Sequence, residues 1–301
     1  MVGSSLSRLS DWLVTHLPGP GGIEGSLAES ERRSLSLFAV RALPEVCKAQ
    51  GPRWNWHHRL ICDHLQAVSE GRIRGLVLCI PPDHGTSTLV SLLWPAWHWL
   101  WHPEARQLTG AHDLRDSELH LVRTRRLLDS RWYRWRYRAV LAPAGPSRLE
   151  LSTPQGGRRW AFGMGGANCG RRADLVVLDR PMRVADRSNA AVKRLVAEAF
   201  DSRLMTWLSD PRSQGWVVAT PRLARDDLPG RLMLREGVVT LALPAEFDPS
   251  RRAETSFGRD PRVEPGESLW PHLAGTETLA TIFDGLGREL YNAMYLQEPV
   301  D

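Results

Sequence analysis

The feature that most restricts the fold is a short apolar run joined through a glycine-containing loop to a longer apolar segment. Residues 76–80 read Leu-Val-Leu-Cys-Ile, which is typical of a strand buried on both faces. After Gly85 the chain becomes apolar again, from about Thr88 to Trp101. That second segment is interrupted by a proline and a histidine and is shorter than the roughly 18 apolar residues of a membrane span. We therefore expect a buried helix there, and no membrane partner.

The same alternation of short apolar runs and helical patterns continues along the chain. Strands are expected at 107–111, 148–152, 160–163, 175–178, 216–219 and 238–243, with a hairpin around Gly156-Gly157. Helices are expected at 116–128 and, capped by Ser188, over a segment that includes 192–200. Strands that alternate with helices predict an α/β fold with a mostly parallel central sheet flanked by helices.

The length of 301 residues allows one large domain or two small ones. Residues 1–33, with Pro18-Gly19-Pro20-Gly21-Gly22 in the middle, are predicted to form a loose, flexible arm. Residues 34–300 are predicted to form a single domain. It begins with a helical lead-in that runs through an amphipathic stretch to a helix at about 60–68.

Charge and cysteine content narrow the function classes. The net charge of +5 permits a polyanionic partner without establishing one. The four cysteines (Cys47, Cys62, Cys79 and Cys169) are scattered, so neither a zinc site nor a disulfide framework is expected and a reducing cytoplasm suits them. The N-terminus has no basic flank followed by an apolar core, so no signal peptide is expected.

The loop between the first strand and its helix is the first motif with a chemical meaning. It reads Pro81-Pro82-Asp83-His84-Gly85-Thr86-Ser87-Thr88, and a strand–loop–helix junction is where backbone N–H groups bind phosphates. In a working loop of this kind, the residue after the last glycine is lysine and the next hydroxyl binds Mg²⁺. Here Ser87 has the hydroxyl position, but Thr86 replaces the lysine and Asp83 adds a negative charge.

A second motif ends the apolar run 175–178. The carboxylate of Asp179 follows this strand, as in enzymes that hold Mg²⁺ near a nucleotide. The next residue in such enzymes is usually a second acid that polarises the attacking water, and here it is Arg180. A core strand that ends in a surface aspartate is the alternative for this segment alone. Both motifs together, in an α/β alternation, predict a P-loop NTPase fold.

With these motifs in place, the chain resembles the ATPase domain of tailed-phage large terminase subunits. The resemblance covers nearly the whole chain: Trp54-Asn55-Trp56-His57 with Leu60-Ile61-Cys62 and His64-Leu65, the loop 80–88, Gly165-Gly166-Ala167 with Gly170 and 174–181, Arg222-Leu223 with Asp226-Asp227-Leu228 and Gly230, Ser268-Leu269-Trp270-Pro271, and Tyr295-Leu296-Gln297-Glu298-Pro299. The family ordinarily has Arg and Lys at positions 83 and 86, two adjacent acids at 179 and 180, and Gln and His at 221 and 224.

The resemblance implies roles for particular residues. It implies a fold of the additional-strand, RecA-like type, with ATP and Mg²⁺ as cofactors. Nucleotide would be bound by loop residues 82–88, with Trp56 and His57 near the adenine, and Mg²⁺ by Ser87 and Asp179. The alternative for His57 and His58 is that they are packing residues, because histidines beside tryptophans are more often packed than chemically active. Arg222, Asp226 and Asp227 would belong to the motif that couples the ATP state to DNA movement. In this family an RNase H-like nuclease domain follows, and its absence is expected here because the sequence ends at Asp301.

An arginine-rich stretch lies between the two motifs. It contains Arg123, Arg125, Arg126, Arg131, Arg134, Arg136 and Arg138, interleaved with two tryptophans and two tyrosines. Such spacing suits contact with DNA phosphates, with aromatic packing beneath. Two alternatives remain open at this point. One of Arg123, Arg125 and Arg126 acts as an arginine finger on the nucleotide of a neighbouring subunit, or the stretch is a solvated helix face.

These observations lead to one main functional hypothesis and two alternatives. The main hypothesis is the ATPase domain of a phage or prophage large terminase, with impaired hydrolysis, working in the cytoplasm of the bacterial host. Its partners would be double-stranded DNA, the portal, the small terminase subunit and copies of itself in a ring. The first alternative is a non-enzymatic remnant or adaptor, and the second is an unrelated helicase-like ATPase, which the C-terminal motifs disfavour.

Overall fold

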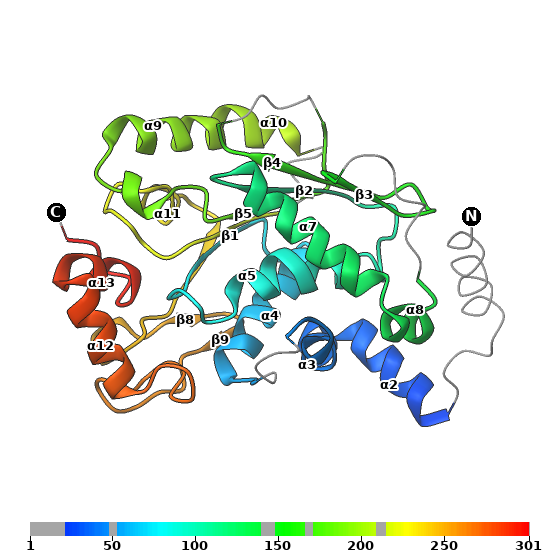
Figure 1. Cartoon of the computed structure of the whole chain (residues 1–301), viewed down its shortest axis with the longest axis horizontal. Helices are drawn as coiled ribbons and strands as arrows, with labels where there is room; N and C mark the ends of the chain where they lie inside the picture. Colours follow the sequence, from blue (N-terminus) through cyan, green and yellow to red (C-terminus); the bar gives the residue numbers. More distant parts are fainter. Residues whose placement is uncertain (1–21, 48–52, 140–147, 166–170, 209–214, 301) are drawn as a thin grey trace, which may run out of the picture.

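The computed structural model describes residues 22–47, 53–139, 148–165, 171–208 and 215–300. A seven-stranded sheet forms its centre, in the order β3-β4-β2-β5-β6-β1-β7 (Figure 1). Neighbouring strands are parallel, except that β3 and β4 form an antiparallel hairpin. The strands are β1 (Gly75–Cys79), β2 (Arg106–Ala111), β3 (Glu150–Ser152), β4 (Arg158–Gly163), β5 (Leu175–Asp179), β6 (Gly215–Ala219) and β7 (Val238–Ala242).

This sheet confirms the predicted mixed α/β class. Strands β1 and β5, which precede the two predicted motifs, are separated by one strand, β6, which is the additional strand of the predicted fold type. Every residue of β1, β5 and β6 is buried, as expected for central strands of a sheet with helices on both sides. Because side chains alternate along a strand, Leu76 and Leu78 pack into one hydrophobic cluster and Val77 and Cys79 into the other.

The larger helical layer covers the first of these faces (Figure 1). It consists of α2 (Gly22–Arg33), α3 (Leu35–Val46), α4 (Trp56–Ser69), α5 (Thr86–Thr88), the π-helix η1 (Leu89–Leu93), α6 (Trp94–His98), α7 (Leu114–Leu128) and α8 (Arg131–Tyr137). No helix in the described part of the chain is both long and apolar enough to cross a membrane.

The opposite face carries fewer helices (Figure 1). They are α9 (Ala190–Ala199), the π-helix η3 (Phe200–Leu204), α10 (Met205–Trp207) and α11 (Leu228–Leu232), with the 3₁₀ turn η2 (Val184–Asp186) before α9. A C-terminal cluster packs separately around α12 (Thr276–Leu286) and α13 (Arg288–Met294), and is preceded by η4 (Pro249–Arg251) and the small hairpin β8 (Glu254–Thr255) and β9 (Gly258–Arg259).

The structure departs from the sequence prediction at three places. Residues 22–33 form α2, although the sequence predicted a loose arm there, because this helix buries Glu31 against Arg136 of α8. Residues 1–21 lie outside the described part. Helix α9 is capped by Asn189 rather than by Ser188, since the Asn189 side chain accepts hydrogen bonds from Ala191 N and Val192 N. Helix α8 itself was not predicted.

Candidate functional site

The predicted phosphate-binding loop lies between β1 and an unbroken helical run formed by α5, η1 and α6. The loop turns through two residues in the left-handed region, Asp83 (φ 64°) and Gly85 (φ 81°). A Cβ atom on Gly85 would lie 2.8 Å from His58 Nε2, so glycine is required both by the backbone angle and by the close packing of the loop on α4. The predicted strand–loop–helix junction is therefore present.

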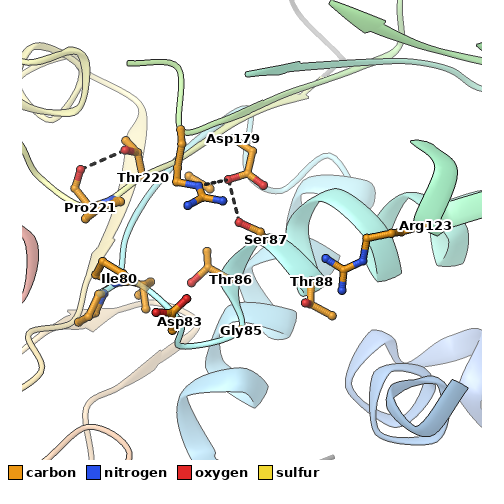
Figure 2. Close-up of a pocket in the computed structure, with 14 residues that line it drawn as sticks. Ile80, Asp83, Gly85, Thr86, Ser87, Thr88, Arg123, Asp179, Thr220 and Pro221 are labelled. Carbon is orange, nitrogen blue, oxygen red and sulfur yellow. Dashed lines mark hydrogen bonds and ion pairs between the residues drawn. The ribbon is translucent and has the colours of Figure 1, made fainter. Parts of the chain in front are cut away.

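A cavity of about 250 Å³ opens at this junction. Its walls come from three segments that are distant in sequence: loop residues 80–83 and 85–88, the end of β5 with Asp179 and Arg180, and the end of β6 with residues 219–221. His84, which was predicted to bind nucleotide with the rest of the loop, is buried and does not line this cavity. Arg123 from α7 completes the lining and points toward Thr88 (Figure 2). Because β1, β5 and β6 are parallel neighbours, their carboxyl ends meet at one edge of the sheet, where α/β proteins bind ligands.

The two predicted motifs meet in this cavity through a hydrogen bond. Ser87 Oγ donates to Asp179 Oδ1 at 3.0 Å, although the residues are 92 positions apart in sequence (Figure 2). Ser91 Oγ on η1 donates to the other carboxylate oxygen at 2.7 Å, and His120 Nε2 on α7 lies 3.3 Å from it. Asp179 is only 2 % exposed, so these groups hold its carboxylate in one orientation beside the loop.

Sequence reasoning missed Ser91 and His120. The helical spacing of Ser87 and Ser91 puts both hydroxyls on one face of the run, and this was the only available signal. His120 is almost fully buried, and burial lowers its pKa, while the attraction of Asp179 opposes that change.

The residues around Asp179 offer the kind of ligands that Mg²⁺ takes beside a nucleotide. Mg²⁺ binds oxygen atoms, usually keeps several waters, and is held by one or two carboxylates together with substrate phosphates. Ser87 Oγ and the Asp179 carboxylate meet that description. Among the described residues no cluster of three or more His, Cys, Asp or Glu side chains could hold a metal without such help.

Arg180 is the unusual member of the cavity. Its backbone adopts a left-handed conformation (φ 49°) and is held by hydrogen bonds from Arg180 N to Ala219 O and from His112 N to Arg180 O. The side chain is 58 % exposed, and its Nε lies 4.0 Å from Asp179 Oδ1. A cation therefore lines the cavity at the position where the sequence resemblance led us to expect a second acid.

A second cavity of about 500 Å³ adjoins the loop and shares Asp83, Gly85 and Thr88 with the first. Its remaining lining comes from α3, α4 and the C-terminal segment, and includes His58 and Trp270. Its size and partly apolar walls suit the base of a nucleotide.

The residues predicted to lie near the adenine do not line either of these two cavities. His57 is fully buried behind the loop, with Nε2 3.2 Å from His84 O. Trp56 packs against the guanidinium of Arg262 at 5.7 Å. The reason is local: α4 begins with a capping box in which His58 Nδ1 accepts from Asn55 N, and this cap directs His58 to the cavity side. His58, the neighbour of the predicted residue His57, is the histidine of α4 that lines the second cavity.

His84 of the loop forms a buried layer with His57 and His58 of α4 and with Trp270. His57, His58 and His84 are each no more than 4 % exposed. Burial lowers the pKa of His57 to about 2 and that of His58 to about 4, and it lowers the pKa of His84 as well. These side chains are therefore neutral at physiological pH and support the loop by packing, without adding positive charge to it.

The predicted coupling motif connects the cavity wall to the C-terminal segment. Directly after the wall residues Thr220 and Pro221, Arg222 N donates to Gln297 Oε1 at 3.0 Å, and Arg222 Nε lies 3.0 Å from Asp227 Oδ1. Asp227 is 2 % exposed and caps α11. Asp226 instead pairs with Lys193 on α9 at 2.5 Å, which lowers its pKa.

The arginine-rich stretch does not form one continuous surface. Arg123 lines the first cavity, and Arg125 donates to Glu150 O at 3.3 Å. Arg126, Arg131 and Arg138 are exposed, and Arg134 is partly exposed. Arg136 is only 4 % exposed and pairs with Glu24 and Glu31 of α2. Its prediction as a DNA-facing residue is therefore wrong, because a buried guanidinium with two carboxylate partners cannot reach a phosphate backbone.

Residues 166–170, which include Gly166, Ala167 and Gly170 of the segment before β5, lie outside the described residues.

Comparison with known proteins gives similarity at the level of fold. No protein-family model matches the sequence, and no curated protein matches it. Among solved structures, the HK97 bacteriophage large terminase is similar with a TM-score of 0.49 and 14 % identity, over 72 % of this chain and 44 % of that one. The ATPase domain of the Thermus phage P74-26 large terminase, as its R139A mutant, has a TM-score of 0.47 and 11 % identity, over 78 % and 93 % of the two chains. This chain thus spans less than half the length of the HK97 protein.

Proposed function

We propose that this chain is the ATPase-domain portion of a phage or prophage large terminase, the motor that packages viral DNA into a procapsid, and that its hydrolysis of ATP is impaired. The observation that carries the proposal is the 3.0 Å hydrogen bond between Ser87 and Asp179 in a cavity walled by the loop 80–88. A hydroxyl and a strand-end carboxylate brought together at a phosphate-binding loop are the parts with which P-loop enzymes hold Mg²⁺ beside a nucleotide.

The impairment follows from two substitutions at the same site, one that removes a positive charge and one that replaces a negative charge with a positive one. Thr86 puts a neutral hydroxyl where the loop normally carries a lysine, so the charge that builds up on the phosphates in the transition state lacks its usual partner. Arg180 stands where an acid normally polarises the attacking water. Each change is expected to lower the rate by about a hundredfold or more, by analogy with the loss of other charged transition-state partners.

The remaining parts of the proposal concern partners. We propose double-stranded DNA as the polyanion that contacts the exposed arginines Arg126, Arg131 and Arg138 and the partly exposed Arg134. The portal, the small terminase subunit and a homo-oligomeric ring follow from the sequence resemblance, as does the cytoplasm of the bacterial host. The hydrogen bond between Arg222 and Gln297 supports a coupling role for residues 222–227, because it links the cavity wall to the C-terminal segment.

Turnover measurements on the purified chain, with and without DNA, test the proposal. We expect very slow ATP hydrolysis by the unaltered protein. The triple variant Thr86→Lys, Asp83→Arg and Arg180→Asp is expected to hydrolyse ATP much faster, because it restores both missing charges and removes the carboxylate from the loop. Brisk hydrolysis by the unaltered chain would contradict the impairment, and tight DNA binding without any nucleotide binding would favour a non-enzymatic adaptor.

A further inference from the structure

The phosphate-binding loop of the proposed nucleotide site has no side chain that could balance the negative charge of the phosphates. Besides the backbone N–H donors of such a loop, phosphates of a nucleotide are stabilised by positive charge, yet this loop carries an exposed carboxylate, Asp83, and no cation. Thr86, in the usual lysine position, has a buried Oγ1 with no hydrogen-bond partner in the described part of the chain. The histidines under the loop are neutral. Any compensating cation therefore has to come from another wall of the cavity.

Arg180 is placed to supply that cation. It lines the same cavity as the loop. Its Nε lies 4.0 Å from Asp179 Oδ1, and Ser87 Oγ lies 3.0 Å from the same oxygen atom. The guanidinium and the Ser87 hydroxyl that would face the nucleotide's phosphates therefore both lie near the same oxygen of Asp179.

The fold does not need this side chain where it is. The Asp179 carboxylate already accepts hydrogen bonds from Ser87 and Ser91 and lies beside His120, so it does not depend on Arg180. The Arg180 side chain is 58 % exposed. Its left-handed backbone is one that asparagine or glycine adopts more readily than arginine. A strained backbone that presents an exposed cation to a cavity indicates a binding role.

We propose that Arg180 binds the phosphates of the nucleotide in place of the missing loop lysine, and that the site therefore binds ATP without requiring Mg²⁺. This inference rests on the proposed function. That Mg²⁺ is not required follows from the position of Arg180. Its guanidinium and a bound Mg²⁺ would both lie next to one carboxylate oxygen of Asp179, and two cations that close repel each other. Arg123 lines the cavity at its other end, near Thr88 (Figure 2), and does not compete for Asp179.

Calorimetric titration of the whole chain with ATP, in EDTA and in excess Mg²⁺, tests this. The unaltered protein is expected to bind ATP in EDTA, and Mg²⁺ should change its affinity by less than about threefold. Arg180→Asn keeps the left-handed backbone and removes the charge, so affinity in EDTA should fall by about tenfold or more, the value of one charge-assisted hydrogen bond. Arg180→Lys should retain part of the affinity. The matched control is Arg183→Gln, which removes an exposed arginine paired with Asp186 on the same loop, and should leave binding unchanged.

The outcomes separate this inference from the proposed function, with inorganic tripolyphosphate as a second probe. If ATP binds and Arg180→Asn binds it equally well, or if binding strictly requires Mg²⁺, the role of Arg180 is refuted and the nucleotide site stands. If tripolyphosphate binds through Arg180 and ATP binds no better, the anion site stands and the nucleotide function fails. If neither probe binds in either buffer, both are wrong. Circular dichroism of each variant verifies that the fold is intact.

Discussion

Replacing Arg136 with methionine is expected to release helix α2 from the rest of the domain. The Arg136 guanidinium contacts both carboxylate oxygens of Glu31, with Nε at 2.5 Å and Nη2 at 2.7 Å, and Nη1 lies 2.5 Å from Glu24. Glu31 is 3 % exposed. Without the guanidinium, the partners of this buried carboxylate within the described part of the chain are the Tyr137 hydroxyl at 2.6 Å and the half-exposed Arg41 at 3.4 Å.

The magnitude follows from the burial of this pair. Removing one partner of a buried ion pair costs about 3–5 kcal/mol, because the other charge stays buried without compensation. Two donors to Glu31 remain, so a value near the lower end, about 3 kcal/mol, is expected. Of the twelve residues of α2 only Ala28 and Glu31 are buried, so little apolar contact is lost when the helix separates. Local opening of α2 is therefore expected to precede global unfolding.

Hydrogen–deuterium exchange is the measurement that checks this. Backbone amides of α2 are expected to exchange about a hundredfold faster in Arg136→Met, since 1.4 kcal/mol corresponds to a factor of ten, while β1 and β5 stay protected. The control Arg131→Met removes an exposed arginine from the same helix and should change stability by no more than about 0.5 kcal/mol. Unchanged exchange in α2 together with a large loss of DNA affinity would refute the reasoning and return Arg136 to the DNA-facing surface.

Three further predictions concern pH, DNA and the loop. Burial holds the pKa of His57 near 2 and that of His58 near 4, so below pH 6.5 the unfolded chain binds more protons than the folded one. The free energy of unfolding should therefore be highest above pH 6.5 and fall by about 2 kcal/mol per histidine at pH 5. An unchanged midpoint of urea unfolding between pH 7 and pH 5 would contradict this. The double variant Arg126→Gln with Arg131→Gln should weaken binding to all DNA sequences and lower the slope of log affinity against log salt by about 2. The control Arg288→Gln, which removes the exposed arginine at the start of α13, should change neither the affinity nor the slope. Asp83→Asn should tighten ATP binding by about tenfold, because it removes an exposed carboxylate from the phosphate loop; calorimetry that shows equal affinities would place Asp83 away from the phosphates.

The sequence alone was sufficient to locate the central strands and the two motifs, because their signals are local. The run 76–80 and the run 175–178 are continuous and apolar, and both are buried strands in the structure. The glycine at position 85 marks a left-handed turn directly before a helix. The parallel arrangement followed from strands alternating with helices, so the meeting of the strand ends at one edge of the sheet was also predictable. Ser87 was predicted from its position in the loop and Asp179 from its position at the end of the run 175–178, and the two residues are hydrogen-bonded.

Only the tertiary structure decided which side chains surround those motifs and which charges are buried. Helical periodicity does not reveal that an arginine in a basic stretch is opposed by a carboxylate from a helix more than 100 residues earlier, as Arg136 is by Glu31. In the same way, the choice between His57 and His58 depended on the cap of α4 and on the position of Trp270. The physical reason is that burial and ion pairing are set by contacts between distant segments, whereas strand and turn signals lie within a few neighbouring residues.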